Sequence, residues 1–384
     1  MTAPALPAQR LERVRAALDE AGLDGLYVAS PVDDVNHRHS ANRRYLTGFT
    51  GSTGYAAVSP TQAMLAVDAR YTDQARREAE PRGFTVFDTK GPQSAWLPEF
   101  VAAVGLAGKR VGLSRSDLSY GDFLTLQEAL APMPEADRPE LVPAPPIIER
   151  LRSRKDAEEI ALLEEAIAIA QRAFLDVTAT VEPGVTERAF AAALDAAVKE
   201  HGARGLSFEP IVAGGERAAM PHADLSDRPL GPGEPIIVDW GAELSGYCSD
   251  LSRTFWLDAE PERFREVYEV VREAQQTAIE RVESGMTGAD AHALAASVIE
   301  ERGYGDAFTH GLGHGVGLDV HDYPPYLGPT STDVLEDGMV FTIEPGIYLP
   351  GWGGVRIEDI VTLEGGRARQ LSTLDSTLPA GART

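Results

Sequence analysis

The first 150 residues carry apolar positions in short blocks that predict alternating helices and strands. A helical spacing covers residues 7–20, and the apolar segment GLYVA follows it. Two runs with strand character, YAAVS and AMLAV, precede a second helical stretch over residues 71–80. Because helical and strand periods alternate along this part of the chain, we expect it to form an α/β unit.

The pattern changes between residues 131 and 146, where prolines are frequent and neither period is sustained. This composition is typical of a connector between domains. A charged segment with a clear helical period, RLRSRKDAEEIALLEEAIAIAQRAFL, follows it. A chain of 384 residues is also too long for one ordinary core. We therefore expect two domains, residues 1–148 and 149–384.

The second domain contains an internal repeat. Residues 181–202, VEPGVTERAFAAALDAAVKEHG, align without a gap with residues 282–303, VESGMTGADAHALAASVIEERG, at an offset of 101. Each copy combines a helix end, a Gly-x-Thr turn whose threonine can cap the next helix, an alanine-rich helix and a final glycine. Chance similarity between two alanine-rich helices is the alternative explanation. A duplication would give the domain two related halves.

Each copy of the repeat is followed by a segment that reads as a strand, a glycine-containing turn and a second strand. The register expected for the first hairpin places Asp239 directly opposite Asp250. A register centred on Gly351 places Glu344 directly opposite Glu358 in the second. Opposed side chains lie about 5 Å apart on one face of a sheet. Each acid pair would therefore repel unless a cation lay between its members.

A glycine-rich segment, THGLGHGVGLDVHDYP, supplies His310, His314 and His321. The spacing of the first two would suit a zinc-binding helix, but four glycines between residues 311 and 317 disfavour a helix. We expect an extended or looped backbone, in which the glycines permit close approach of other groups. A lone histidine is more often a core or surface residue than a ligand. Three within one such stretch favour functional use.

Three further residues bear on this site. His222 lies in a polar segment and could be a solvated loop histidine. Arg356 precedes Glu358 by two residues and so points to the same strand face, where a guanidinium would keep carboxylates ionised. A purely stabilising ion pair is the alternative role for Arg356. Asp359 alternates to the opposite face, so we expect it to lie outside the ligand set.

The residue types define the expected chemistry. Four carboxylates and one imidazole form the mixture of ligands that hard or borderline divalent ions prefer. An ionised side chain pointing inward from a strand is costly without a cation to neutralise it. The sequence therefore predicts a two-metal hydrolase site whose ligands are Asp239, Asp250, His314, Glu344 and Glu358.

Charge and composition exclude several classes of function. The net charge of -24 argues against nucleic acid and anionic membrane surfaces as partners, because both need a basic face. The chain contains no run of about 18 apolar residues, so we expect no membrane-spanning helix. The first 22 residues lack the continuous apolar stretch of a signal peptide. Cys248 is the only cysteine, which fits a reducing cytoplasm and excludes a thiolate zinc cluster.

The motifs DWGAELSGYCSDLSRTF, HGLGHGVGLDVHDYPPY, TIEPGIY and VRIEDI resemble those of the "pita-bread" metallopeptidases, specifically their Xaa-Pro peptidase branch. RRYLTGFTGSTGYAAV and VDARY resemble, more loosely, the smaller domain of Xaa-Pro aminopeptidases. The resemblance implies a mixed α/β (α+β) chain. Its pita-bread catalytic domain would have two halves related by a pseudo-two-fold axis, preceded by a creatinase-type N-terminal α/β domain. Methionine aminopeptidases generally lack such a domain and are disfavoured.

The resemblance also implies how the ligands share two metal ions. Asp250 and Glu358 would bridge the ions, Asp239 would complete one of them, and His314 with Glu344 would complete the other. A hydroxide held between the ions would attack the carbonyl that precedes proline.

Further catalytic roles follow from the same resemblance. Glu344 would also shuttle the proton from the attacking water to the proline nitrogen. His222, His310 and His321 would bind substrate and stabilise the tetrahedral intermediate, and Arg356 would support the acids.

The expected activity is that of an Xaa-Pro aminopeptidase acting on peptides with proline at the second position, in a homodimer, as the resemblance implies. An Xaa-Pro dipeptidase shares every ligand and is the nearest alternative; it must reject longer peptides. A metal-free creatinase-like relative or an inactive binding module is a remote alternative, because such proteins lose ligands that this chain keeps. Manganese is the expected metal, while zinc and cobalt would also fit.

Overall fold

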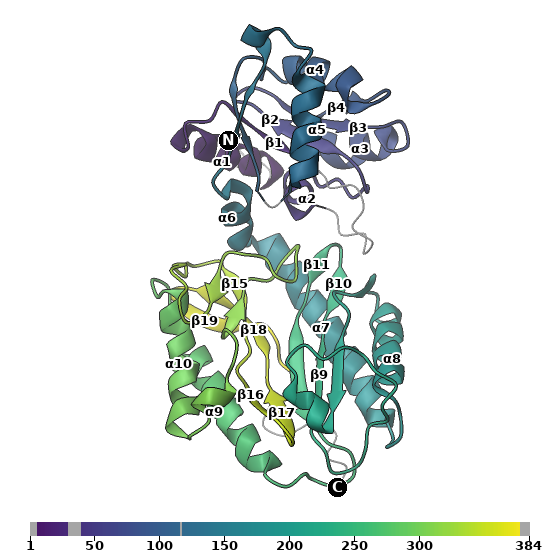
Figure 1. Ribbon diagram of the computed structural model, residues 1–384, viewed down its shortest axis with the longest axis vertical. Helices are drawn as coiled ribbons and strands as arrows, with labels where there is room; N and C mark the ends of the chain where they lie inside the picture. The colour runs from purple at the N-terminus through teal and green to yellow at the C-terminus, as the bar shows by residue number, and fades with distance from the viewer. Residues whose placement is uncertain (1–5, 30–39, 116, 377–384) are drawn as a thin grey trace. The chain divides into compact units, whose positions relative to one another are not determined.

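The computed structural model describes residues 6–29, 40–115 and 117–376. The chain divides into two compact units, Met1–Arg152 and Ser153–Thr384 (Figure 1). Each unit has its own hydrophobic core. Within the described residues, no helix is both long enough and apolar enough to span a membrane.

The first unit is built on a mixed six-stranded sheet with the order β4-β3-β2-β1-β5-β6. Its strands are β1 (Gly25–Val28), β2 (Tyr55–Val58), β3 (Ala63–Val67), β4 (Thr85–Asp88), β5 (Arg110–Leu113) and β6 (Glu140–Pro143). Its helices are α1 (Leu6–Glu20), α2 (Ala41–Thr47), α3 (Thr72–Ala79), α4 (Gln93–Ala103) and α5 (Tyr120–Leu130), and α6 (Ile147–Ser153) leads into the second unit along the chain. The predicted α/β unit is confirmed: the two expected helices are α1 and α3, and the three expected strands are β1, β2 and β3.

The expected connector between residues 131 and 146 is wrong in part, because it contains β6. This strand pairs in parallel with β5 over its whole length, from Arg110↔Glu140 to Leu113↔Pro143. It forms the edge of the sheet. Proline cannot donate to a ladder, but it is tolerated on an edge strand. Frequent prolines here mark a sheet edge as well as a domain junction.

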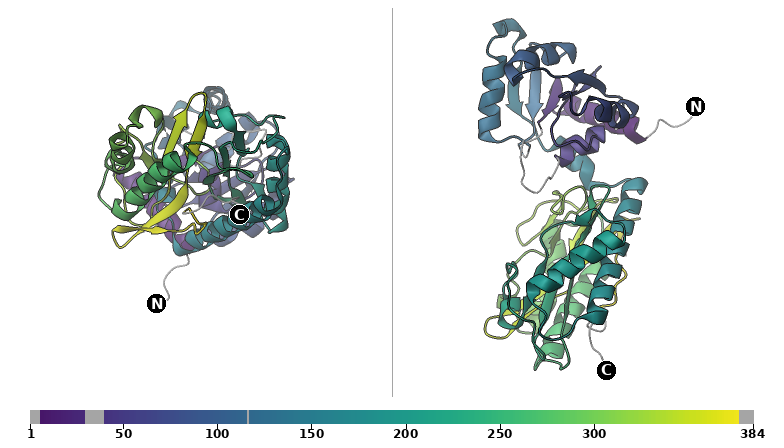
Figure 2. Two further views of the ribbon diagram at one scale, coloured as in Figure 1. Left: turned by 90° about the horizontal axis from the view of Figure 1, so that it is seen from below. Right: turned by 90° about the vertical axis from the view of Figure 1, so that its right-hand side faces the viewer.

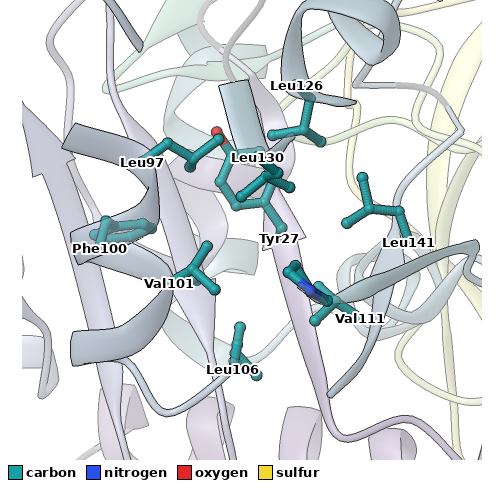
Figure 3. Close-up of a pocket in the computed structure, with 11 residues that line it drawn as sticks. Tyr27, Leu97, Phe100, Val101, Leu106, Val111, Leu126, Leu130 and Leu141 are labelled. Atoms are coloured by element: carbon teal, nitrogen blue, oxygen red, sulfur yellow. The ribbon is translucent and has the colours of Figure 1, made fainter. Parts of the chain in front are cut away.

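A small apolar cavity lies in the core of the first unit, against helices α4 and α5 (Figure 3). Its volume is about 10 Å³, and its lining includes Tyr27, Leu97, Phe100 and Leu130. The hydroxyl of Tyr27 accepts a hydrogen bond from Gln93 at 3.3 Å. A buried water needs two to four polar partners, which this lining does not offer. The cavity is a packing gap, far too small for a peptide.

The second unit consists of two halves with helices on their outer sides (Figures 1 and 2). The first half contains α7 (Ala157–Thr180), α8 (Glu187–Glu200), β7 (Gly205–Leu206), β8 (Ile211–Gly214), β9 (Ile236–Trp240), β10 (Ala242–Leu244), β11 (Tyr247–Cys248) and β12 (Leu251–Phe255). The second half contains α9 (Phe264–Arg281), α10 (Gly288–Glu301), β13 (Gly313–His314), β14 (Tyr326–Leu327), β15 (Val340–Ile343), β16 (Gly346–Leu349), β17 (Gly353–Arg356), β18 (Asp359–Glu364) and β19 (Arg367–Gln370).

The predicted duplication is confirmed by the helix starts of the two halves. Helices α8 and α10 each have 14 residues and begin 101 residues apart. The Thr186 side chain caps α8 by accepting from the Ala189 amide at 3.1 Å. The Thr287 side chain caps α10 by accepting from the Asp290 amide, also at 3.1 Å. Each cap satisfies a backbone donor that the helix itself cannot pair.

The turn before each helix is also equivalent. Gly184 and Gly285 have φ of 98° and 94°, a left-handed conformation that favours glycine. The Gly184 amide donates to the Leu230 carbonyl, and the Gly285 amide donates to the Leu335 carbonyl, both at 2.8 Å. In each half a long loop thus returns to the start of the second helix. Those two loops carry the histidines that the sequence singles out.

Candidate metal centre

Asp239 and Asp250 come from the hairpin of the first half. The register expected for this hairpin is wrong, because β9 and β12 pair Asp239 with Ser252 rather than with Asp250. The turn is formed by Ser245 and Gly246, which have φ of 50° and 87°. A tight two-residue turn of this kind needs positive φ at both positions. Asp250 lies two residues before Ser252, so both carboxylates still belong to one face of the hairpin.

Glu344 and Glu358 come from the hairpin of the second half, and the register centred on Gly351 is confirmed. Both ladders of this hairpin, β15 with β18 and β16 with β17, have that centre. Glu344 follows β15 and Glu358 precedes β18, so the shared register sets them across from each other. Asp359 takes the opposite face, as expected, and pairs there with Arg253 at 2.8 Å.

The two hairpins join at Ser252 and Glu358. The Glu358 amide donates to the Ser252 carbonyl at 3.1 Å, and the Ser252 hydroxyl donates to Glu358 Oε2 at 2.9 Å. Close by, the Arg356 amide donates to Thr254 Oγ1 at 3.0 Å. These bonds run between the halves, and they bring acids from both hairpins to one place.

The glycine-rich segment forms no helix, and its glycines provide close approach as expected. A Cβ atom on Gly313 would lie 2.0 Å from the Thr342 carbonyl oxygen. One on Gly315 would lie 2.2 Å from the Asp322 carbonyl oxygen. Real Cβ contacts are never this short, so only glycine fits at these positions. The strand that carries His314 is thereby pressed against its neighbours.

The backbone also fixes which nitrogen of His314 is available. Nδ1 lies 3.0 Å from the Gly315 carbonyl oxygen. A carbonyl can only accept, so Nδ1 carries the proton and Nε2 keeps its lone pair. Nε2 lies 3.4 Å from Glu344 Oε1 and 3.6 Å from Asp250 Oδ2. Burial, reinforced by nearby His321, lowers the pKa of His314 to about 3. The imidazole is therefore neutral, the form that binds metals.

Three of the five predicted ligands form a tight group. Asp250, His314 and Glu358 are buried, and each offers a ligand atom within 4.8 Å of those of the other two. Glu344 joins them through its short distance to His314. Asp239 adjoins the group, with its Oδ2 bound to Arg356 Nη2 at 2.6 Å. The structure thus brings together all five residues.

The electrostatics of this group call for a cation. Burial and repulsion from Glu358 raise the pKa of Asp250 well above its ordinary value. Burial and repulsion from Glu344 do the same to the pKa of Glu358. Desolvation raises the pKa of Glu344 to about 8, although Arg356 opposes the shift. Four acids facing one guanidinium leave an uncompensated negative charge, which divalent ions would neutralise.

Two unpaired oxygen atoms indicate where such ions fit. Oδ1 of Asp239 and Oδ1 of Asp250 are buried and accept no hydrogen bond from any residue that the structure describes. Buried carboxylate oxygens are otherwise almost always paired. With a neutral imidazole nitrogen beside them, these oxygens form a donor set suited to divalent cations.

Arg356 and Tyr348 form a hydrogen-bonded support behind the acids. Arg356 is buried; its Nη1 donates to Tyr348 Oη at 2.9 Å and its Nε donates to Ser252 Oγ at 2.8 Å. Tyr348 Oη also lies 2.9 Å from His310 Nε2. Our sequence reasoning missed Tyr348. The signal was available, because Tyr348 follows Glu344 by four residues and so shares its strand face.

The three other histidines lie near the acid group. The His321 ring lies 4.2 Å from that of His314 and perpendicular to it. His310 is linked to Arg356 through Tyr348. Burial and the charge of Arg356 lower the pKa of His310 to about 4, and His222 is close enough to add to this effect. His222 and His321 are exposed to solvent.

A fold with two duplicated halves and this group of candidate metal ligands points to a metal-dependent hydrolase, and comparison with known proteins agrees. Residues 161–364 match the model of metallopeptidase family M24, and residues 10–154 match the creatinase/prolidase N-terminal domain. The chain belongs to metallopeptidase family M24, with a pita-bread catalytic domain preceded by a creatinase-type domain. The family implies divalent metal ions and peptide substrates.

Relatives and solved structures cover almost the whole chain. The chain is 34% identical over 373 residues to the Xaa-Pro dipeptidase of Pyrococcus furiosus, a match that covers 96% of this chain and 99% of the relative. The structure of an Xaa-Pro dipeptidase from Bacillus anthracis matches with a TM-score of 0.88 at 34% identity, over 97% of this chain and 99% of that one. The structure of an X-Pro aminopeptidase from Thermotoga maritima matches with a TM-score of 0.83 at 32% identity, over 94% and 99%.

Proposed function

We propose that this protein is an Xaa-Pro dipeptidase that uses two divalent metal ions. The buried group of Asp250, His314 and Glu358, with two unpaired carboxylate oxygens beside it, carries the metal-dependent part of the proposal. Full-length similarity to proteins named Xaa-Pro dipeptidase supports the choice of substrate. The proposal therefore takes the alternative that the sequence left open, in place of the aminopeptidase that was expected first.

The ligands divide between the two halves of the catalytic unit. Asp239 and Asp250 of the first half would hold the ions together with His314, Glu344 and Glu358 of the second. When bound, the two ions would supply an activated water and polarise the carbonyl that precedes proline. Manganese is the proposed native ion, because oxygen ligands outnumber a single imidazole.

The chain's own groups would manage the proton and the developing charge. Glu344 would accept the proton of the attacking water and deliver it to the proline nitrogen, which becomes the leaving amine. His310 and His321 would stabilise the negative charge on the carbonyl oxygen, and His222 would help to bind the substrate. Arg356 would hold the Asp239 side chain in place through its 2.6 Å bond.

Xaa-Pro aminopeptidase activity is the second candidate function. The match to the structure of an X-Pro aminopeptidase from Thermotoga maritima favours it. The two activities differ only in whether the site accepts residues beyond the proline, so a comparison of substrates of two lengths separates them.

The test is an assay of the manganese-loaded protein on an Xaa-Pro dipeptide and on the tripeptide Xaa-Pro-Yaa with the same first residue. We expect cleavage of the dipeptide with a kcat/KM at least about tenfold higher than for the tripeptide, which is a difference of 1.4 kcal/mol. Preference for the tripeptide would establish the aminopeptidase instead. No metal-dependent cleavage of either peptide would overturn the peptidase proposal.

Two further features belong to the same proposal. The lone Cys248 is consistent with a reducing compartment such as the cytoplasm. A homodimer is proposed from the family resemblance, and light scattering of the purified protein would test it.

A further inference from the structure

A buried carboxylate in the first half, that of Glu187, forms hydrogen bonds to the loop that carries His222. Glu187 is the first residue of α8 and is fully buried. Its Oε1 accepts from the Gly214 amide at 3.1 Å, and its Oε2 accepts from the Ser226 hydroxyl at 2.6 Å. Both oxygens accept from Arg217 Nε at 3.1 Å. The Glu187 side chain thus binds both ends of the segment 214–226, at Gly214 and Ser226, and also Arg217 within it.

Arg217 extends the hydrogen bonds of Glu187 to a further part of this loop. Arg217, held by Glu187, donates from Nη2 to the Asp224 carbonyl across the base of the segment. A carboxylate that accepts several hydrogen bonds, some from a guanidinium, forms strong charge-assisted bonds. Removing such a buried partner would leave Arg217 and the Gly214 amide unsatisfied. The conformation of residues 214–226 therefore depends on Glu187.

The opposite side of the same segment lies against the second half. A Cβ atom on Gly353 would lie 2.8 Å from the Gly215 carbonyl oxygen, and one on Gly354 would lie 2.2 Å from the Ala218 carbonyl oxygen. Arg356, at the end of the same strand, donates from Nη1 to the Pro221 carbonyl at 3.2 Å. The segment is thus confined between Glu187 and β17, and its last contact before His222 is with the arginine of the metal centre.

We infer that Glu187 is a positioning residue for His222. His222 itself is exposed, so its place beside His310 comes from the loop and not from burial of its own ring. The conformation of the loop is held by Glu187, whose hydrogen bonds run to Gly214, Arg217 and Ser226 and not to the acid cluster. This inference rests on the proposed function of His222 in substrate binding, and it adds a residue that determines where His222 stands.

The variant Glu187→Gln tests the inference, because it keeps the shape of the side chain and removes its charge. Misplacing a group in the active site commonly costs about tenfold or more in rate, so we expect kcat/KM on an Xaa-Pro substrate to fall about tenfold. Manganese affinity by calorimetry should change less than about twofold, because the ligands lie on other segments. Amide hydrogen exchange should increase in residues 215–226 and stay unchanged around β15 and β18.

Arg188 offers a matched control. It neighbours Glu187 and binds the same loop from outside, through Asp227 at 3.1 Å and the Leu225 carbonyl at 3.1 Å. Both charged side chains of this pair are more than half exposed, so the bond contributes little. Arg188→Ala should leave kcat/KM within about twofold of the wild type.

A double-mutant cycle with His222→Ala separates positioning from general destabilisation. If Glu187 acts through His222, Glu187→Gln should have almost no further effect on kcat/KM in the His222→Ala background. Full multiplication of the two effects would overturn the inference, as would equal losses of manganese affinity and activity. Hydrogen exchange decides the matter independently of catalysis: unchanged exchange in residues 215–226 overturns the positioning role. An inactive wild type would refute the proposed function alone.

Discussion

The two halves of the catalytic unit have the same arrangement of helices and turns, but different residues contact their long loops at the equivalent helix start. The first residue of α8 is Glu187, a buried carboxylate that binds its loop through four hydrogen bonds. The first residue of α10, at the same position of the repeat, is Gly288. There the loop itself comes so close that a Cβ atom would lie 2.0 Å from the Tyr326 carbonyl oxygen. One half uses a charged side chain where the other uses no side chain.

This difference shows what the duplication preserved. The caps Thr186 and Thr287 and the turn glycines before them repeat, because they satisfy the backbone of any helix in that place. The candidate metal ligands repeat only in part: each half supplies two acids, aspartates in the first and glutamates in the second, but only the second half supplies a histidine, His314. Structural equivalence and chemical equivalence are therefore separate properties of the halves.

The largest expected effect is a loss of activity on replacing an acid of the metal centre. We compare Glu344, from the second half, with Asp239, from the first. Glu344→Ala should lower kcat by about a thousandfold, because a positioned proton shuttle contributes roughly 10²–10⁴. Asp239→Ala should instead act mainly through lost metal. Steady-state kinetics together with metal analysis would distinguish them. If Glu344→Ala retains substantial turnover with its metal bound, Glu344 is not the shuttle.

The next effect tests the contrast at the helix starts. Gly288→Ala would place a methyl group against the Tyr326 backbone, and overpacking of this kind costs about 3 kcal/mol at its upper range. Thermal and urea unfolding would measure the loss. The matched control is Gly121→Ala, in the first turn of α5, where the nearest atom would be 3.7 Å away. That change should leave stability the same or raise it. Equal behaviour of the two variants would contradict the close packing at Gly288.

A smaller effect concerns His310, in the long loop of the second half, and the pH dependence of stability. His310 of the second half has a pKa lowered to about 4 by burial and Arg356. Above pH 6.5 its ring is neutral in both the folded and unfolded states. As the pH falls from 6.5 towards 4, only the unfolded ring gains a proton, so the free energy of unfolding should drop, by about 2 kcal/mol given the ring's partial exposure. Urea unfolding of the wild type and of His310→Gln at each pH would show it; parallel curves would contradict it.

The smallest expected effect concerns the helix caps. Thr186→Ala and Thr287→Ala should each cost about 1 kcal/mol. The second should cost slightly more, because the Thr287 hydroxyl also donates to Asp290 Oδ2 at 2.7 Å, and the alanine variant loses this bond of the capping box as well. Urea unfolding of the two variants side by side is the measurement. A clear loss in only one variant would show that the halves are less equivalent than their backbones suggest.

The same contrast explains what could be predicted from the sequence. The repeat was visible because caps and turns are local signals. The register centred on Gly351 was correct. The register of the first hairpin was wrong because φ at Ser245 could not be read from its residue type, which rarely adopts a positive value. The edge strand β6 was hidden by its prolines.

Contacts between side chains that lie far apart in the sequence were out of reach. Nothing local to Glu187 indicates that it binds Arg217 and Ser226, about thirty to forty residues further along the chain. Tyr348 likewise has a strand-like neighbourhood that does not reveal its bond to His310. The candidate ligands could be proposed because residue type and shared strand face sufficed, whereas the residues that support them depend on tertiary packing.

The proton on Nδ1 of His314 is held by a peptide carbonyl, that of Gly315. No point substitution can delete a peptide carbonyl, so the tautomer of this candidate ligand is fixed by the backbone and not by any one side chain. Substituting any of the four acids or the arginine behind them would change the charge and size of the centre. The imidazole of His314 would still present the same lone pair.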